Sequence, residues 1–134
     1  MVASASQPDF VLPLLRRLAS QIFATEAFAF STVGMGRVGQ PQVICHIRPD
    51  GASLAKVEAA RKAAIQLIEP CLRESKDVAI ELGGDVGSEE NPQYALVSLL
   101  RDQSESRKII GAILMITRCT GVDDARQRLR MLQG

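Results

Sequence analysis

Residues 94–117 read YALVSLLRDQSESRKIIGAILMIT, and this stretch decides the fold. Two apolar runs, 94–101 and 108–117, flank a polar connector at 102–107, which predicts two strands that pair antiparallel. In the second run both alternating sets of residues are apolar, so both faces of that strand must be covered. The pattern therefore predicts a central strand in a sheet that lies between two layers.

The N-terminal part of the chain predicts a helix followed by a hairpin. Apolar residues at helical spacing predict an amphipathic helix over 9–25, with Asp9 as its N-cap. Residues 27–33 carry Phe28, Phe30 and Thr32 at every second position, and 42–48 carry apolar side chains at the same spacing, which is typical of strands. The glycine-rich segment 34–39 lies between them and is expected to form the hairpin loop.

The middle of the chain predicts a long helix that begins after a cap at Ser53 and runs to about Glu69. Pro70 lacks the N–H that the helical hydrogen-bond ladder needs, so the helix is expected to end or kink there. The other expected elements are a short strand over 77–82, a flexible loop over 83–92 and an Arg-rich helix over 123–132.

This order of elements predicts an α+β fold built as a three-layer sandwich. We expect a central antiparallel sheet of five to six strands, with the N- and C-terminal helices on one face and the connecting helix and loops on the other. The length of 134 residues fits a single domain over 9–134, with a disordered leader at 1–8. The last helix is expected to lead into a linker and a further domain.

Composition excludes several classes of function. Apolar residues make up 46% and charged residues 23%, as in ordinary folded domains, and a net charge of +1 disfavours a nucleic-acid binder. The longest apolar run, 109–116, is too short to cross a bilayer, so we expect no membrane insertion. The N-terminus has no signal-peptide pattern, and an odd number of cysteines without CxxC spacing favours reduced thiols in the cytoplasm.

Two motifs suggest ligand chemistry but lack the context for it. The segment 34–39 has the letters G-x-G-x-x-G, yet it leads into a strand, whereas phosphate binding needs a helix N-terminus. Asp85, Glu89 and Glu90 lack the spacing of a calcium loop and are expected to be solvated. We therefore expect no metal and no cofactor.

The C-terminal third resembles the GAF domain, a small-molecule sensing module of signalling proteins. Residues 95–102 and 109–116, with the sequence Ile-Gly-Ala-Ile inside the second run, resemble the two closing strands of that family, and 123–132 resembles its final helix. The resemblance implies a non-enzymatic regulatory domain that binds a small molecule or a partner. It also implies a homodimer that passes its signal through the terminal helices.

A second resemblance concerns the sequence Arg48-Pro-Asp-Gly and the long Ala-rich helix that follows it. This arrangement is similar to GAF-like modules that precede the haemolysin-D-type membrane-fusion proteins of efflux systems. It implies an alternative function, a dimerisation or assembly module without a ligand in a secretion or efflux adaptor. The apolar stripe available for such pairing on the first helix consists of Phe10, Leu14, Leu18 and Ile22.

The GAF resemblance also implies a ligand site between the sheet and the connecting helix and loops. Carried over by position, the candidate ligand-binding residues are His46 and Arg48 on one strand, Tyr94 and Ser98 on another, and Met115 on the last strand. Each of these residues also has an ordinary structural interpretation, as a core or surface side chain.

The same family suggests two kinds of covalent chemistry, and the sequence disfavours both. Cys45-His46 resembles a bilin attachment dipeptide, but adjacent strand residues point to opposite faces and cannot line one pocket. Free methionine-sulfoxide reductases use cysteine pairs, and no nucleophile and resolving pair is evident among Cys45, Cys71 and Cys119. We therefore expect no enzymatic activity and no catalytic residue.

Overall fold

The computed structural model describes residues 3–32, 41–48, 51, 53–83, 91–101 and 108–133, with the side chains described from Val11 onward. Five strands form one antiparallel sheet in the order β2-β1-β5-β4-β3. The strands are β1 (Glu26–Ser31), β2 (Gln42–Ile47), β3 (Val78–Gly83), β4 (Gln93–Arg101) and β5 (Ile109–Arg118), and the helices are α1 (Ala3–Gln21), α2 (Leu54–Glu74) and α3 (Val122–Gln133).

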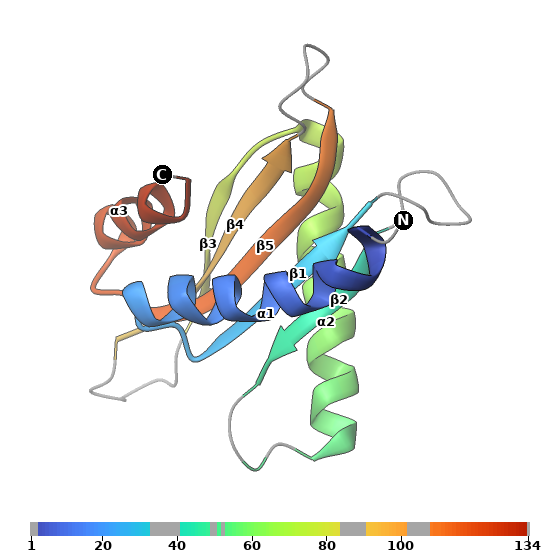
Figure 1. Ribbon diagram of the computed structural model, residues 1–134. Coiled ribbons are helices and arrows are strands. Elements are labelled where there is room, and N and C mark those ends of the chain that lie inside the picture. Colours follow the sequence, from blue (N-terminus) through green and yellow to red (C-terminus); the bar gives the residue numbers. More distant parts are fainter. Residues whose placement is uncertain are drawn as a thin grey trace.

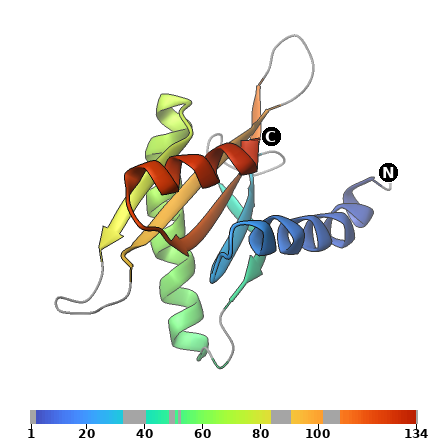
Figure 2. The same ribbon diagram turned by 90° about the vertical axis from the view of Figure 1, so that its left-hand side faces the viewer.

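The three helices cover the sheet from two sides. Helices α1 and α3 lie on one face and α2 lies on the other, as Figures 1 and 2 show. The predicted α+β sandwich with both terminal helices on one face is confirmed. The predicted central hairpin is also confirmed, because β5 pairs with β4 on one side and with β1 on the other.

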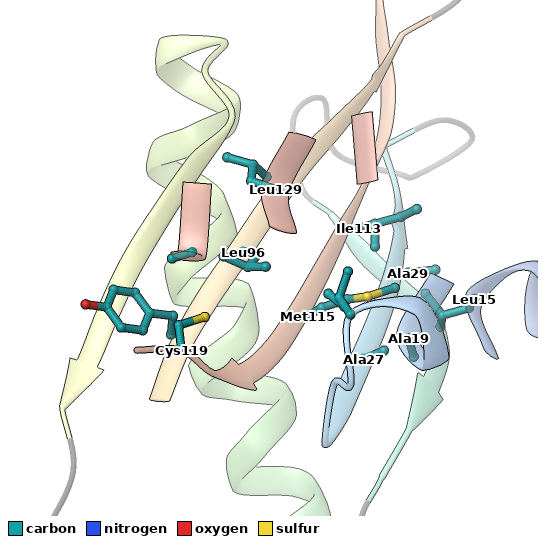
Figure 3. Close-up of a cluster of buried hydrophobic side chains, with 12 residues drawn as sticks. Leu15, Ala19, Ala27, Ala29, Leu96, Ile113, Met115, Cys119 and Leu129 are labelled. Atoms are coloured by element: carbon teal, nitrogen blue, oxygen red, sulfur yellow. The ribbon is translucent and has the colours of Figure 1, made fainter. Parts of the chain in front are cut away.

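Each face of the sheet has its own apolar core. The cluster beneath α1 and α3, drawn in Figure 3, contains Leu15, Ala19, Ile22, Ala27, Ala29, Tyr94, Leu96, Ile113, Met115, Cys119, Ala125 and Leu129. The cluster beneath α2 contains Phe28, Phe30, Ala64, Ile68, Cys71, Val97, Leu99, Ala112 and Leu114. β5 therefore contributes to both cores, as its two apolar faces predict.

Three predicted helix boundaries are wrong. Helix α1 begins at Ala3, so Asp9 lies inside the helix and does not cap it, and part of the expected leader is helical. The same helix ends at Gln21 and not at about residue 25. Helix α2 continues through Pro70 to Glu74. Proline removes one hydrogen bond of the ladder, but Cys71, the next residue, is buried against the sheet, and that packing keeps the last turn helical.

Several predictions concern segments that the structure does not describe. The G-x-G-x-x-G segment at 34–39 and the acidic residues Asp85, Glu89 and Glu90 lie outside the described residues. Among the residues that are described, no helix combines the length and apolarity that crossing a membrane requires.

Candidate functional site

The end of α1 carries an exposed aromatic residue in an unusual backbone conformation. Phe23 has a φ of 57°, and its side chain is 78% exposed. Its N–H donates to the carbonyl of Ser20 at 3.3 Å, and the N–H of Ala24 donates to the carbonyl of Ala19 at 2.8 Å. These two bonds form a Schellman motif, whose left-handed position is usually glycine because a Cβ there is strained.

Replacing this residue by glycine is expected to stabilise the protein. Phe23→Gly relieves the left-handed strain and removes a ring that is mostly in solvent, so the free energy of unfolding should rise by about 1 kcal/mol. Urea denaturation of the two proteins measures the difference. A loss of stability in Phe23→Gly would mean that the ring contributes packing and is not a strained surface group.

Phe23 borders a surface groove between the end of α1 and the end of β2. The groove has a volume of about 530 Å³ and opens to solvent. Its lining is mostly apolar, with Ala19, Phe23, Ala24 and Ile47 beside the polar Arg16 and Ser20. All of these residues except Ile47 come from α1 and the turn that ends it, and Ile47 is the last residue of β2. The groove can therefore accommodate an apolar group, and Arg16 can bind a negative charge beside it.

A buried polar network holds the end of α1 in place. The Thr117 hydroxyl, on β5, lies 3.1 Å from the carbonyl oxygen of Ile22 and 3.2 Å from that of Phe23, so it can donate to either. The Arg128 guanidinium, on α3, donates to the carbonyl of Ile22 at 2.9 Å and to Thr117 Oγ1 at 2.8 Å. A cation at a helix C-terminus also interacts favourably with the helix dipole.

Asp124 positions Arg128 from within α3. Its carboxylate accepts from the backbone N–H of Thr120 at 2.9 Å and from Arg128 Nε at 3.2 Å. The Thr120 N–H lowers the pKa of Asp124 below its usual value, and the charge of Arg128 adds to this effect against the opposing effect of burial. The chain of contacts therefore links α1, β5 and α3.

The shift at Asp124 makes stability dependent on pH in the acid range. A carboxyl with a lowered pKa contributes stability above its unfolded pKa and loses that contribution as the pH falls through its folded pKa. Asp124→Asn should cost about 1 kcal/mol at neutral pH and progressively less as the medium is acidified. Urea denaturation at several pH values tests this, with Asp123→Asn as the matched control. A constant difference at all pH values would contradict the role of the Asp124 charge.

The five ligand-binding residues proposed from the sequence do not form one site. His46 stacks on Phe28 with ring centroids 4.1 Å apart, and its Nε2 lies 2.8 Å from Glu26 Oε2. Phe28 belongs to the core beneath α2, so His46 is on that face. Its side chain is only 1% exposed, and its Nδ1 is buried without a hydrogen-bond partner in the described part of the chain. Arg48 is exposed just beyond β2.

The remaining three candidates lie on the opposite face. Tyr94 and Met115 are buried in the core beneath α1 and α3, and Ser98 is opposite Ile113 of that same core. The structure therefore brings Tyr94, Ser98 and Met115 to one face but separates them from His46 by the sheet. The sequence analysis did not predict that Phe23 is a candidate site residue. The one local signal is that no glycine follows the helix where the chain must turn.

The three cysteines are free thiols in the structure. Burial raises the pKa of Cys45, Cys71 and Cys119, and the charge of Arg16 offsets this effect only partly at Cys45. A raised pKa keeps a thiol protonated at neutral pH, which disfavours nucleophilic chemistry. Among the described residues, no three His, Cys, Asp or Glu side chains gather as metal ligands.

Thiol labelling is expected to follow this burial. Cys71 is 4% and Cys119 0% exposed, so a disulfide reagent at neutral pH should modify each roughly a hundredfold more slowly in the native protein than in urea. Cys45, which is only partly buried, should react before them. Variants that retain a single cysteine assign the rates. Native labelling of Cys119 at the unfolded rate would contradict its placement in the core.

Comparison with known proteins does not add a family to this description. No family model matches the chain, and no curated protein matches it.

Proposed function

We propose that this chain is a non-enzymatic binding domain whose site is the groove beside Phe23, and that its terminal helices transmit the bound state. The observation that carries the proposal is the exposure of a phenyl ring held in a left-handed backbone conformation. Glycine would satisfy the turn at lower cost, and a large apolar side chain gains nothing from solvent. Strained residues of this kind gather at binding sites, where exposed aromatic rings act as anchors.

The chemistry of the reactive side chains supports a non-enzymatic function. The thiols are kept protonated by burial, and the one histidine is occupied by Glu26 and Phe28. A regulatory domain of the GAF type, in a reducing cytoplasm, is compatible with these features. We therefore propose that the chain is a regulatory domain of the GAF type.

The polar network supports transmission through the terminal helices. A ligand in the groove contacts the end of α1, whose last carbonyls are bound by Thr117 and Arg128. Arg128 belongs to α3, so a displacement at the end of α1 changes the hydrogen bonds of α3. Such coupling requires that the ligand binds two arrangements of the helices with different affinities.

The burial of the apolar stripe on α1 gives little support to the alternative assembly function. Ile22 is buried, and Leu18 packs against the core beneath α1 and α3. Of the described members of the predicted pairing stripe, only Leu14 is exposed, at 48%. The stripe therefore covers this protein's own sheet, and Leu18→Glu should impair folding before it impairs any dimer.

A small aromatic carboxylate tests the groove directly. In 3-phenylpropionate the phenyl ring can pack on Phe23 and Ile47, and the carboxylate can bind Arg16. Titration followed by two-dimensional amide NMR should shift the signals of the groove residues and then those of α3 near Arg128. Native mass spectrometry of the purified protein would show any molecule that it retains, together with its subunit number.

Two variants provide the comparison. Phe23→Gly should weaken binding of 3-phenylpropionate by about tenfold while the protein remains folded. Leu54→Ala, at an equally exposed apolar residue on α2, should leave binding unchanged. Signals that shift equally in wild type and Phe23→Gly, or that lie away from the groove, would overturn the proposed site.

A further inference from the structure

We propose that the groove receives an extended acidic segment of a partner protein, which pairs with the free edge of β2. This inference rests on the proposed function and assigns the occupant of the same site. It combines three observations: a strand edge beside the groove with no further strand on it in the described residues, Arg16 and Arg17 on the helix that lines the groove, and the aromatic anchor at Phe23.

The edge of β2 is open to a further strand. Among the described strands, β2 is the terminal one and pairs with β1 alone (Figure 1). A terminal strand turns half of its backbone N–H and C=O groups outward, where an added strand can bond them. The sequence of β2, QVICHI, has no lysine, acidic residue or proline, which are the residues that commonly protect such edges. The opposite edge, β3, carries Glu81.

An added strand would place side chains in the groove. Side chains of a strand alternate between the two faces of the sheet, so every second residue of the partner would face α1. Ile47 lies both in β2 and in the groove lining, so the strand edge and the groove are adjacent. Apolar side chains of the partner would then contact Ala24 and the ring of Phe23. On β2 itself, Ile44 is 42% exposed and has no counterpart in the register with β1.

The charge around the groove selects the partner. Residues 11–25 and 41–48 contain Arg16, Arg17 and Arg48 and no aspartate or glutamate. All three arginines are exposed, and none forms an ion pair or a side-chain hydrogen bond with the described part of the chain. Surface cations attract an acidic segment and repel a basic one. An extended peptide with an apolar centre and acidic ends satisfies both the edge and the groove, because its central side chains can contact Phe23 while a terminal carboxylate reaches Arg16.

Fluorescence anisotropy with labelled peptides tests the proposal. The probe is a capped peptide of about nine residues, a length typical of a strand, with valines at its centre and glutamates at both ends. One control peptide has lysine in place of glutamate, and another has proline at its centre, which removes a backbone donor. At low salt the glutamate peptide should bind at least about tenfold more tightly than either control.

Variants and NMR identify the binding site. Arg16→Gln combined with Arg17→Gln, both on α1, should weaken binding of the glutamate peptide about tenfold, and Phe23→Gly should weaken it similarly. Arg61→Gln, at an exposed arginine of α2, should leave it unchanged. Hydrogen exchange should slow at amides of 42–47 in the complex.

The outcomes separate this inference from the proposed function. If 3-phenylpropionate binds the groove but the glutamate peptide binds no better than the lysine peptide, the groove is retained and the acidic strand is wrong. If the proline peptide binds equally well, or protection appears along β3, pairing with β2 is wrong. If neither 3-phenylpropionate nor any peptide binds, the proposed function fails as well. A protein that dimerises through β2 and excludes the peptide would also overturn the inference.

Discussion

Gly111→Val is expected to lower the free energy of unfolding by about 3 kcal/mol. A Cβ at this position would lie 2.4 Å from the carbonyl oxygen of Phe30, which belongs to the neighbouring strand. Gly111 is in β5 with partners on both sides, Ser31 of β1 and Leu100 of β4. The side chain cannot be accommodated by a rotamer change, because the atom in its way is backbone. Urea denaturation monitored by circular dichroism measures the loss.

Gly121→Ser is the matched control for this substitution. A Cβ at Gly121 meets no atom within 4 Å, and this glycine precedes α3, where serine is a favoured capping residue. Its free energy of unfolding should change by less than about 0.5 kcal/mol. Equal effects of the two substitutions would show that β1 and β5 do not approach each other as closely as described.

Thr117→Val is expected to cost about 2 kcal/mol, because it removes the hydroxyl that contacts the carbonyls of Ile22 and Phe23, and Arg128 remains to bind only that of Ile22. Thr117 is fully buried, and its hydroxyl serves the carbonyls of Ile22 and Phe23 while it accepts from Arg128. Valine has nearly the same shape, so the loss measures hydrogen bonding and not volume. The variant should also loosen the turn at Phe23 and weaken binding of 3-phenylpropionate.

Thr25→Val removes a hydroxyl of the same kind from an exposed position. The Thr25 hydroxyl donates to the carbonyl of Ile116 at 3.2 Å, but water replaces that bond when it is lost. We expect a change of less than about 0.5 kcal/mol. A similar loss in Thr25→Val and Thr117→Val would mean that burial of the network contributes nothing to its strength.

The fold was largely predictable because local patterns and burial agree along most of the chain. The apolar residues on both faces of β5 required a central strand, and the structure places it between β1 and β4. The helix boundaries were less predictable. Packing of Cys71 against the sheet extends α2 beyond Pro70, and no local signal in the sequence carries that contact.

The candidate site was not predictable in the same way. The resemblance to the GAF domain implied one pocket for His46 and Met115, but the sheet puts them on opposite faces. The register between β1 and β2 aligns His46 with Phe28, and this long-range pairing decides which face the imidazole occupies. Helical spacing put Phe23 among the apolar residues of the first helix, but its exposure and its left-handed conformation are properties of the folded chain.

The sequence by itself determined the elements, their order and the need for two apolar cores, because these follow from residue spacing and from the hydrophobic effect. Only the tertiary structure decided how α1 ends. Thr117 and Arg128 are distant from Ile22 in the chain, yet they bind its carbonyl and fix the turn that exposes Phe23. Contacts between residues so far apart depend on how α1, β5 and α3 pack together, and the local sequence pattern does not predict that packing.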